Sequence, residues 1–259
     1  MDLGIAGKKA LLTGASKGMG KACAMAVAAE GADVTIVART EKTLLDAAAE
    51  IRARTGAKVT PVVGDIATPE GRTAALAACP EPDILLNNAG GFPPGDFREW
   101  TRADWIAAVD LMMLAPIEMM KATVDGMMAR GFGRIVNIAS RSVKIPQIEL
   151  GLSNGARSGL VGFTAGLARQ TVARNVTINT LLPGIVDSDA QREHIQGLLP
   201  GLGKTFEEVW QARAQANPAR RYGRPDEIGA YFAFLCSAHA GFVTGQNLLI
   251  DGGSYPGTF

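Results

Sequence analysis

The sequence predicts an α/β fold in which one doubly wound parallel sheet of about seven strands carries helices on both faces. Short apolar runs alternate along the chain with longer segments of helical periodicity, which is the pattern of repeated strand and helix units. The predicted strands are rich in β-branched or apolar residues, as in sheets buried on both sides. With 259 residues, of which 47% are hydrophobic, the chain suffices for a single domain with a large core.

The expected strands lie at residues 8–14, 32–38, 58–64, 83–89, 134–140, 176–182 and 246–251. Helical segments separate them, beginning with the runs GKACAMAVAAEG and TEKTLLDAAAEIRAR. Because sheets of this kind bind ligands beyond the carboxyl ends of their strands, we expect the functional residues in the loops that follow the strands.

Bulk properties exclude several classes of partner. A formal net charge of +1 without a basic stripe argues against a nucleic-acid partner. No apolar run approaches the roughly 18 residues needed to span a bilayer, and the N-terminal residues lack the layout of a signal peptide, so we expect a cytoplasmic protein with no membrane partner. Three cysteines lie far apart in apolar surroundings, which predicts buried thiols and no metal site: Cys23, Cys79 and Cys236.

The glycine-rich stretch TGASKGMG, residues 13–20, comes directly after the first strand and before the first helix. Glycines at such a turn let the backbone approach a pyrophosphate, which then lies on the N–H groups and positive dipole of the helix. A glycine-rich turn alone can be no more than a tight loop. Its position between a strand and a helix predicts a dinucleotide site.

The end of the second strand indicates which dinucleotide binds. An acidic residue near this point would hold a ribose 2′-hydroxyl, whereas a basic residue suits a 2′-phosphate. The strand ends with Ala38 and Arg39, and Lys17 lies in the glycine-rich turn, so NADP(H) is favoured over NAD(H). The alternative is that both cations simply face solvent.

Further motifs extend over nearly the whole chain: Asp65-Ile66, NNAG at 87–90, Ser140 after the fifth strand, Pro183-Gly184, GRPDEIG at 223–229 and FVTGQNLLIDGG at 242–253. Together with TGASKGMG they resemble the classical short-chain dehydrogenase/reductase family, most closely its 3-oxoacyl-acyl-carrier-protein-reductase-like branch. The resemblance implies a Rossmann-type fold, hydride transfer between a nicotinamide and a small-molecule substrate, and assembly into a homotetramer or homodimer.

The resemblance also implies a set of cofactor contacts: Gly14, Ser16, Lys17, Gly18, Met19, Gly20, Arg39, Asp65, Ile66, Asn88, Ala89, Gly90, Arg157, Pro183, Gly184, Val186 and Ser188. Ser188 takes the place of the family's threonine at the nicotinamide carboxamide. Residues 185–222 correspond to the family's mobile substrate lid.

The catalytic positions depart from the family's pattern. Family enzymes use an Asn, a Ser, a Tyr and a Lys, of which only the serine is matched, by Ser140. Counting 13 residues onward leads to Ser153 at the tyrosine position, and four more lead to Arg157 at the lysine position. The asparagine position falls on Met112. All tyrosines of the chain lie beyond the sixth strand, at Tyr222, Tyr231 and Tyr255.

These changes alter the expected chemistry. Reducing a carbonyl by hydride needs a proton donor at the forming alkoxide, and a serine hydroxyl is a much weaker acid than a phenol. We expect Ser140 to bind the substrate oxygen, Ser153 to donate a hydrogen bond, and Arg157 to supply positive charge without losing its proton.

Four side chains are candidates for a substitute proton donor: Lys144, Glu149, His194 and Tyr222. His194 has the most suitable intrinsic pKa, although each of the four can also be an ordinary surface or lid residue.

Pro116 predicts an interruption in the helix that carries Met112. Proline lacks the N–H that would bond the carbonyl of residue 112, so we expect a helix that is not straight between residues 108 and 120 and a free carbonyl that binds water. Six methionines on this helix are expected to fill a core or a subunit interface: Met112, Met113, Met119, Met120, Met127 and Met128.

Three functions follow from this pattern. The first, which the intact cofactor motifs favour, is an NADP(H)-dependent oxidoreductase with a rearranged active site. The second is a redox-silent protein that binds nucleotide or ligand as a sensor or as a partner subunit. The third is a lyase or isomerase on the same fold.

Overall fold

The structure is a computed structural model and describes residues 1–258 of the chain. Within these residues, seven strands form one sheet in the order β3-β2-β1-β4-β5-β6-β7, and every neighbouring pair is parallel. The strands are β1 (Lys9–Thr13), β2 (Asp33–Ala38), β3 (Val59–Val63), β4 (Ile84–Asn87), β5 (Gly133–Ile138), β6 (Val176–Pro183) and β7 (Asn247–Ile250). Each begins and ends within two residues of its predicted position, and the predicted α/β fold is confirmed.

The strand order changes direction between β1 and β4. The chain first builds outward from β1 through β2 to β3, then returns to place β4 against the other side of β1 and continues to β7. The loops that follow β1 and β4 therefore diverge, which leaves a crevice at the carboxyl edge of these two strands.

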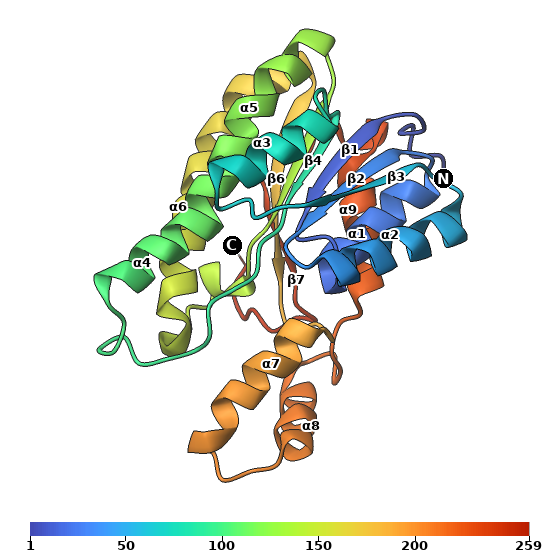
Figure 1. Ribbon diagram of the computed structural model, residues 1–259. Coiled ribbons are helices and arrows are strands. Elements are labelled where there is room, and N and C mark those ends of the chain that lie inside the picture. The colour runs from blue at the N-terminus through green and yellow to red at the C-terminus, as the bar shows by residue number, and fades with distance from the viewer. Residues whose placement is uncertain (259) are drawn as a thin grey trace.

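Helices cover both faces of the sheet (Figure 1). One face carries α1 (Gly18–Ala29), α2 (Glu41–Thr55) and α9 (Pro225–Cys236), and the other carries α3 (Pro69–Ala78), α4 (Arg102–Val109), α5 (Ala115–Arg130) and α6 (Gly151–Thr171). No helix within residues 1–258 combines the length and the apolar character needed to cross a bilayer.

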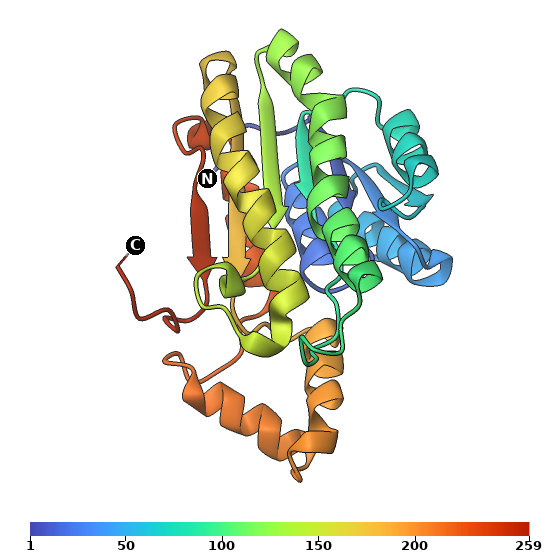
Figure 2. The same cartoon turned by 90° about the vertical axis from the view of Figure 1, so that its left-hand side faces the viewer.

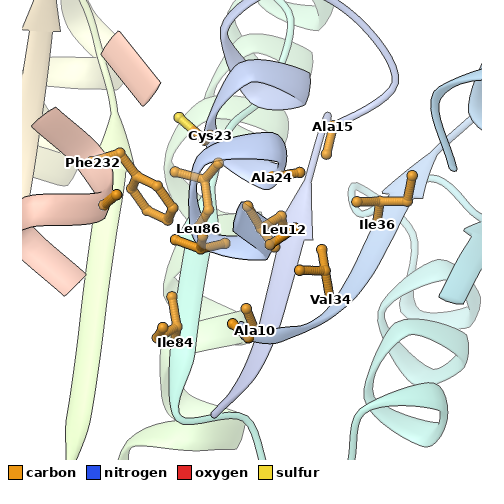
Figure 3. Close-up of a cluster of buried hydrophobic side chains, with 14 of the residues drawn as sticks. Ala10, Leu12, Ala15, Cys23, Ala24, Val34, Ile36, Ile84, Leu86 and Phe232 are labelled. Carbon is orange, nitrogen blue, oxygen red and sulfur yellow. The ribbon is translucent and has the colours of Figure 1, made fainter. Parts of the chain in front are cut away.

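Alternating side chains of the strands supply a hydrophobic core on each face. Leu12 of β1 and Leu86 of β4 point towards α1 and α9, where they lie in one buried cluster with Phe232 (Figure 3). Leu11 and Leu85, one residue before each, are buried in the core beneath α5 and α6. Each fully buried leucine contributes about 1.5–3 kcal/mol relative to an exposed one, so this alternation fixes the register of the central strands.

The helix around Met112 is not regular. Between α4 and α5, Asp110–Leu114 forms a π-helical turn (η1), in which the N–H of Ala115 donates to the carbonyl oxygen of Asp110. Pro116 directly follows this turn, and the predicted interruption is present. The free carbonyl at residue 112 stays a prediction. Met112 itself is buried against apolar residues of α4 and α6.

Methionine and cysteine side chains fill the interior, as predicted. Met119, Met120 and Met127 are fully buried on α5, and Met113 and Met128 are partly buried beside them. The cysteines are buried free thiols at Cys23, Cys79 and Cys236. Burial raises the pKa of each thiol, so none ionises at neutral pH.

Two helices extend beyond the carboxyl edge of the sheet. α7 (Asp189–Leu198) and α8 (Phe206–Ala216) follow β6 and lie below the strands in both views (Figures 1 and 2). The hydroxyl of Ser188 accepts the N–H of Gln191 at the start of α7, and a capping box of Thr205 and Glu208 begins α8. These two helices make up most of residues 185–222, the segment that the sequence assigns to a lid.

Candidate functional site

Hydrogen bonds tie the glycine-rich turn to the end of β4. The fully buried Thr13 hydroxyl accepts the N–H of Asn88 at 3.0 Å and faces the carbonyl oxygens of Asn88 and Leu86 at 3.0 and 3.1 Å. Nδ2 of Asn88 donates to the carbonyl oxygen of Gly14 at 2.9 Å. Two motifs far apart in the sequence thereby hold each other in place.

Glycine is required at position 14 for two reasons. Its φ of +59° lies in the left-handed region, and a Cβ there would lie 2.5 Å from the carbonyl oxygen of Asn88. Gly18, with a φ of +50°, begins α1, and a Cβ at Gly20 would overlap the carbonyl group of Gly14. The turn therefore packs backbone against backbone, as the sequence predicts.

The N-terminus of α1 has no side-chain cap. Lys17 occupies the N-cap position without a side-chain cap hydrogen bond, and the first turn contains no acidic residue. By contrast, side chains cap α3, α4, α7 and α8, namely those of Thr68, Thr101, Ser188 and Thr205. The first backbone N–H groups and the positive end of the α1 dipole are thus available to an anion.

A cavity of about 350 Å³ lies in front of this helix end. Its lining brings together most of the residues that the family resemblance assigns to the cofactor: Gly14, Ser16, Lys17, Arg39, Asp65, Ile66, Asn88, Ala89 and Gly90. The loops after β1, β2, β3 and β4 therefore meet at one place. Met19 does not line the cavity, and packs partly buried against the core.

A larger cavity of about 800 Å³ lies on the outer side of α1. It is lined by α1, α2, the start of α7 and the start of α9, and it contains Ser188. Its charged groups pair with one another, as in Lys21 with Glu50 at 2.9 Å and Arg192 with Asp187 at 2.7 Å. The larger cavity is not lined by the loops after β2, β3 and β4, whereas the smaller cavity is. The smaller cavity is therefore better suited to a dinucleotide.

Residues 183–188 run from the sheet edge towards the glycine-rich turn. Pro183 ends β6, and a Cβ at Gly184 would lie 2.7 Å from Cα of Asp251. Val186 is buried in the core. Ser188 reaches the turn itself, because a Cβ at Gly18 would lie 3.5 Å from Cβ of Ser188.

Ser153 and Arg157 form a buried pair on α6. Nε of Arg157 donates to Oγ of Ser153 at 3.1 Å, and Nη1 donates to the carbonyl oxygen of Ile138 at 2.8 Å. Each of the two side chains is 8% exposed. Ser140 follows β5, and its hydroxyl accepts the N–H of Ser142 at 3.1 Å. The arginine thus joins the serine to β5, two residues before Ser140.

Burial lowers the pKa of Arg157 to about 10. The guanidinium therefore stays protonated and positively charged at neutral pH. Because Nε donates to the oxygen of Ser153, the hydroxyl proton of that serine points elsewhere and is free for another acceptor.

Among the candidate proton donors, the charge of Glu149 affects the pKa of His194. Burial lowers the pKa of His194, the charge of Arg213 lowers it further, and Glu149 raises it in part. Glu149 belongs to a short 3₁₀ turn (η3, Ile148–Leu150) directly before α6.

The other two candidates have partners of their own. The ring of Tyr222 stacks on Trp210 at a centroid distance of 3.8 Å, and its hydroxyl donates to the carbonyl oxygen of Trp210 at 3.2 Å. Burial raises the pKa of Tyr222. Nζ of Lys144 lies 5.3 Å from the ring centroid of Tyr255. Within residues 1–258, no group of three or more His, Cys, Asp or Glu side chains is arranged to hold a metal ion.

The residues after β7 fold over the loop that follows β5. Nη1 of Arg141 donates to Oγ of Ser254 at 2.8 Å, across 113 positions of the sequence. Sequence reasoning did not include Arg141 or Tyr255 among the site residues. The one available signal was that Arg141 directly follows Ser140, while nothing local marks Tyr255.

Comparisons with known proteins agree with this architecture. A family model described as Enoyl-(Acyl carrier protein) reductase matches residues 14–255. The 3-oxoacyl-(acyl-carrier-protein) reductase of Vibrio cholerae serotype O1 is 31% identical over 258 residues, which cover 98% of this chain and 99% of that protein.

Solved structures share the fold. The crystal structure of L-sorbose reductase from Gluconobacter frateurii, complexed with NADPH and L-sorbose, superposes with a TM-score of 0.93 at 32% identity and covers 99% of this chain and 100% of that one. A structure of actinorhodin polyketide ketoreductase with NADPH has a TM-score of 0.90 at 28% identity, and the match covers 95% of this chain and 97% of that one.

Proposed function

This chain belongs to the short-chain dehydrogenase/reductase family of NAD(P)-dependent oxidoreductases, and we propose that it uses NADP(H) on a small carbonyl or hydroxyl compound in a non-standard active site. The observation that carries the proposal is the hydrogen bond from Arg157 to Ser153. By the family resemblance, Arg157 takes the lysine position and Ser153 takes the tyrosine position. The site would therefore have a hydrogen-bonded arginine and serine where the family has a lysine and a tyrosine.

The residues around the smaller cavity fit a dinucleotide. The uncapped N-terminus of α1 and the close-packed glycine-rich turn suit a pyrophosphate, as argued above. Lys17 and Arg39 are exposed at the same cavity and would bind a 2′-phosphate, which favours NADP(H) over NAD(H). Asp65 and Ile66 would hold the adenine. When bound, NADP(H) supplies a hydride to the substrate or takes one from it.

Several relatives support this choice of cofactor and reaction. L-sorbose reductase and actinorhodin polyketide ketoreductase are both described with NADPH. Both names denote reductases of carbonyl compounds, and the match of this chain to each spans nearly its full length. We therefore propose that this chain also acts on a carbonyl or on the matching alcohol.

Ser140 and Ser153 would orient the substrate oxygen. The oxygen of each serine accepts a hydrogen bond, from the N–H of Ser142 and from Nε of Arg157, so both hydroxyl protons remain available. The charge on Arg157 lowers the proton affinity of the Ser153 oxygen and stabilises negative charge that develops nearby. Ser153 thereby acts as a polarised hydrogen-bond donor, since its own pKa is too high for a proton source.

We assign the proton transfer to His194. It is half-buried on α7, and its pKa is raised in part by the charge of Glu149, which lies four residues before Ser153. The lowered pKa favours the neutral imidazole, which can take a proton from an alcohol in the oxidation direction and return it in the reduction direction. Residues 185–222 would then act as the substrate lid that carries this group.

The test is a turnover assay with NADPH and a panel of ketones, aldehydes, imines and enones, followed by the absorbance of the reduced nicotinamide. Ser153→Ala should lower kcat by about tenfold or more, because it removes a donor to the developing charge, while the dissociation constant for NADPH stays unchanged. Ser158→Ala, an exposed serine on the same helix, should leave both values unchanged.

Two outcomes would contradict the proposal. Binding of NADPH without turnover of any compound would favour the redox-silent sensor or partner subunit. Product formation without a change in nicotinamide absorbance would favour a lyase or isomerase.

We also propose a homotetramer or homodimer in the cytoplasm. Exposed apolar side chains occur on the helices of one face, as at Ile106, Leu114 and Phe163, which are 45%, 42% and 40% exposed. Burying such side chains between subunits would remove apolar surface from water. The free buried thiols agree with a reducing compartment. Light scattering coupled to size exclusion measures the assembly state.

A further inference from the structure

In the described residues 1–258, Arg213 has no acidic partner. It lies on α8, and its Nη1 is buried with no hydrogen-bond partner in residues 1–258. Other arginines of this region differ, since Arg192 and Arg221 each pair with a carboxylate at 2.7 Å. Burying a guanidinium nitrogen without an acceptor costs free energy, so this arrangement is favourable only if an acceptor from outside the chain completes it.

A second arginine lies close to Arg213. Nη1 of Arg141 donates to the neutral hydroxyl of Ser254, and Nδ2 of Asn217 lies 3.5 Å from that same oxygen. Asn217 follows α8 directly, one helical turn after Arg213, so the end of α8 meets the loop after β5 here. Arg141 has no carboxylate at ion-pair distance in the described part of the chain.

The charges of neighbouring groups shift the pKa values of side chains in this region. Burial lowers the pKa of Arg141, the charge of Arg213 lowers it further, and the carboxylate of Asp251 raises it in part. Both carboxylate oxygens of Asp251 accept backbone N–H groups of the C-terminal residues. The charge of Arg213 also lowers the pKa of His194. Within residues 1–258, no carboxylate forms an ion pair with Arg141 or Arg213, and Asp251 offsets the positive charge of Arg141 only in part.

Another unpaired donor lies on the neighbouring helix. Nε2 of Gln191 is buried without a hydrogen-bond partner in residues 1–258. Gln191 and His194 are three positions apart on α7 and so lie on one side of it. Gln191 of α7 and Arg213 of α8 thus each have a buried N–H donor without an acceptor in residues 1–258. Both helices belong to the segment 185–222, which lies beneath the carboxyl edge of the sheet (Figure 2).

This donor group is next to the proposed reaction centre. Arg141 directly follows Ser140, and Glu149 lies directly before α6, which carries Ser153. A substrate whose carbonyl oxygen meets the two serines would extend from there towards α7 and α8. The part of the substrate that reaches these helices meets donors and positive charge.

We propose that Arg213, together with Arg141, binds an acidic group of the substrate, so that this enzyme acts on small carbonyl compounds that carry a carboxylate or a phosphate. The inference rests on the proposed function for the place of the carbonyl. A guanidinium matches either oxyanion with two parallel hydrogen bonds. The incoming negative charge offsets the repulsion between the two arginines, which gives selectivity for acids over neutral analogues.

The test measures binding of carbonyl probes by titration calorimetry on the full chain saturated with NADP⁺. Because NADP⁺ has no hydride to transfer to a carbonyl, the probes bind without turnover. Two matched pairs of probes are used: 4-oxopentanoate with its methyl ester, and dihydroxyacetone phosphate with dihydroxyacetone. We expect at least one acidic probe to bind about tenfold or more tightly than its neutral partner. The pair that shows the preference identifies the carboxylate or the phosphate as the recognised group.

Variants assign the preference to a residue. Arg213→Gln should weaken binding of the acid to the level of its neutral partner and leave the neutral partner unchanged, while Arg213→Lys should keep part of the preference. Lys204→Gln removes the same charge from an exposed position before α8 and should change neither affinity. Thermal unfolding is a second readout, because removing a repelled, unpaired cation should leave the melting temperature unchanged or raise it.

Three results would overturn the inference: equal binding of acid and neutral partner in both pairs, an acid preference that survives Arg213→Gln, or no saturable binding of either acid. A structural role for Arg213 would instead lower the melting temperature and weaken acid and neutral probes alike. Failure of the proposed function is distinguishable, since it would appear as absent NADPH turnover while the acid preference and its dependence on Arg213 persist.

Discussion

Thr13→Val removes the hydroxyl that joins the glycine-rich turn to β4 while keeping the shape of the side chain. The wild-type hydroxyl lies 3.0 Å from the N–H of Asn88 and 3.0 and 3.1 Å from two carbonyl oxygens. In the variant, the N–H of Asn88 loses its acceptor in a partly buried position. An unsatisfied buried donor costs about 1–3 kcal/mol, and we expect a loss near the middle of that range.

For a chain of this size, such a loss lowers the melting temperature by about 4–8 °C. The assay is thermal unfolding without nucleotide, combined with a fluorescence titration of NADPH. NADPH affinity should fall as well, because Asn88 also holds the carbonyl group of Gly14.

Thr13→Ser is the matched control. It keeps the hydroxyl and loses only a methyl group, so its stability falls by about 1 kcal/mol while its NADPH affinity is kept. The reasoning is refuted if Thr13→Val melts and binds NADPH like the wild type, or if the serine variant loses NADPH affinity to the same extent.

Three further substitutions test other parts of the structure. Arg39→Gln should weaken NADPH binding by about tenfold or more and leave NADH binding unchanged; equal losses for both would remove Arg39 from the 2′-phosphate site. The hydrogen bond from Arg221, the N–H of Arg224 and both cations lower the pKa of Glu227 to about 2. Its stabilising effect is therefore present above the ordinary pKa of 4.5 and is lost as pH falls towards 2. Glu227→Gln should accordingly be less stable at neutral pH and show a shallower loss of melting temperature across that interval, and identical curves would contradict this. Gly184→Ala places a Cβ 2.7 Å from Cα of Asp251 and should lower the free energy of unfolding by about 1–3 kcal/mol. The control is Gly162→Ala at an exposed position of α6, where the new Cβ meets no atom within 4 Å and stability should be unchanged or higher.

The local sequence pattern was sufficient to predict the sheet because each strand is a short run rich in β-branched or apolar residues, separated from the next by a helical segment. The glycine-rich turn was predictable for the same reason, since it lies directly between a strand and a helix. The interruption before Pro116 also follows from local chemistry, because a proline lacks an N–H wherever it occurs. Its form as a π-helical turn over Asp110–Leu114 was not predicted, because the proline removes a hydrogen bond without specifying its replacement.

The pairing of Ser153 with Arg157 was within reach of the sequence. Residues four apart on a helix lie on one face, so their spacing alone brings the side chains together. The second hydrogen bond of Arg157, to Ile138, was not predictable, because it depends on how α6 packs against β5. Burial by that packing also lowers the pKa of the guanidinium, an effect that no spacing rule contains.

The sequence by itself determined the order of the elements and the glycine-rich turn, whereas the catalytic roles of Ser140, Ser153 and Arg157 stay a proposal. The order and the turn depend on hydrophobic periodicity, backbone freedom and spacing, all of which act over a few residues. Only the tertiary structure decided which distant groups meet. Arg141 reaches Ser254, Tyr222 stacks on Trp210, and Arg213 is left without an acidic partner in the described residues. The physical reason is that burial and pairing depend on the packing of α7, α8 and the C-terminal residues against the sheet edge, which no local pattern specifies.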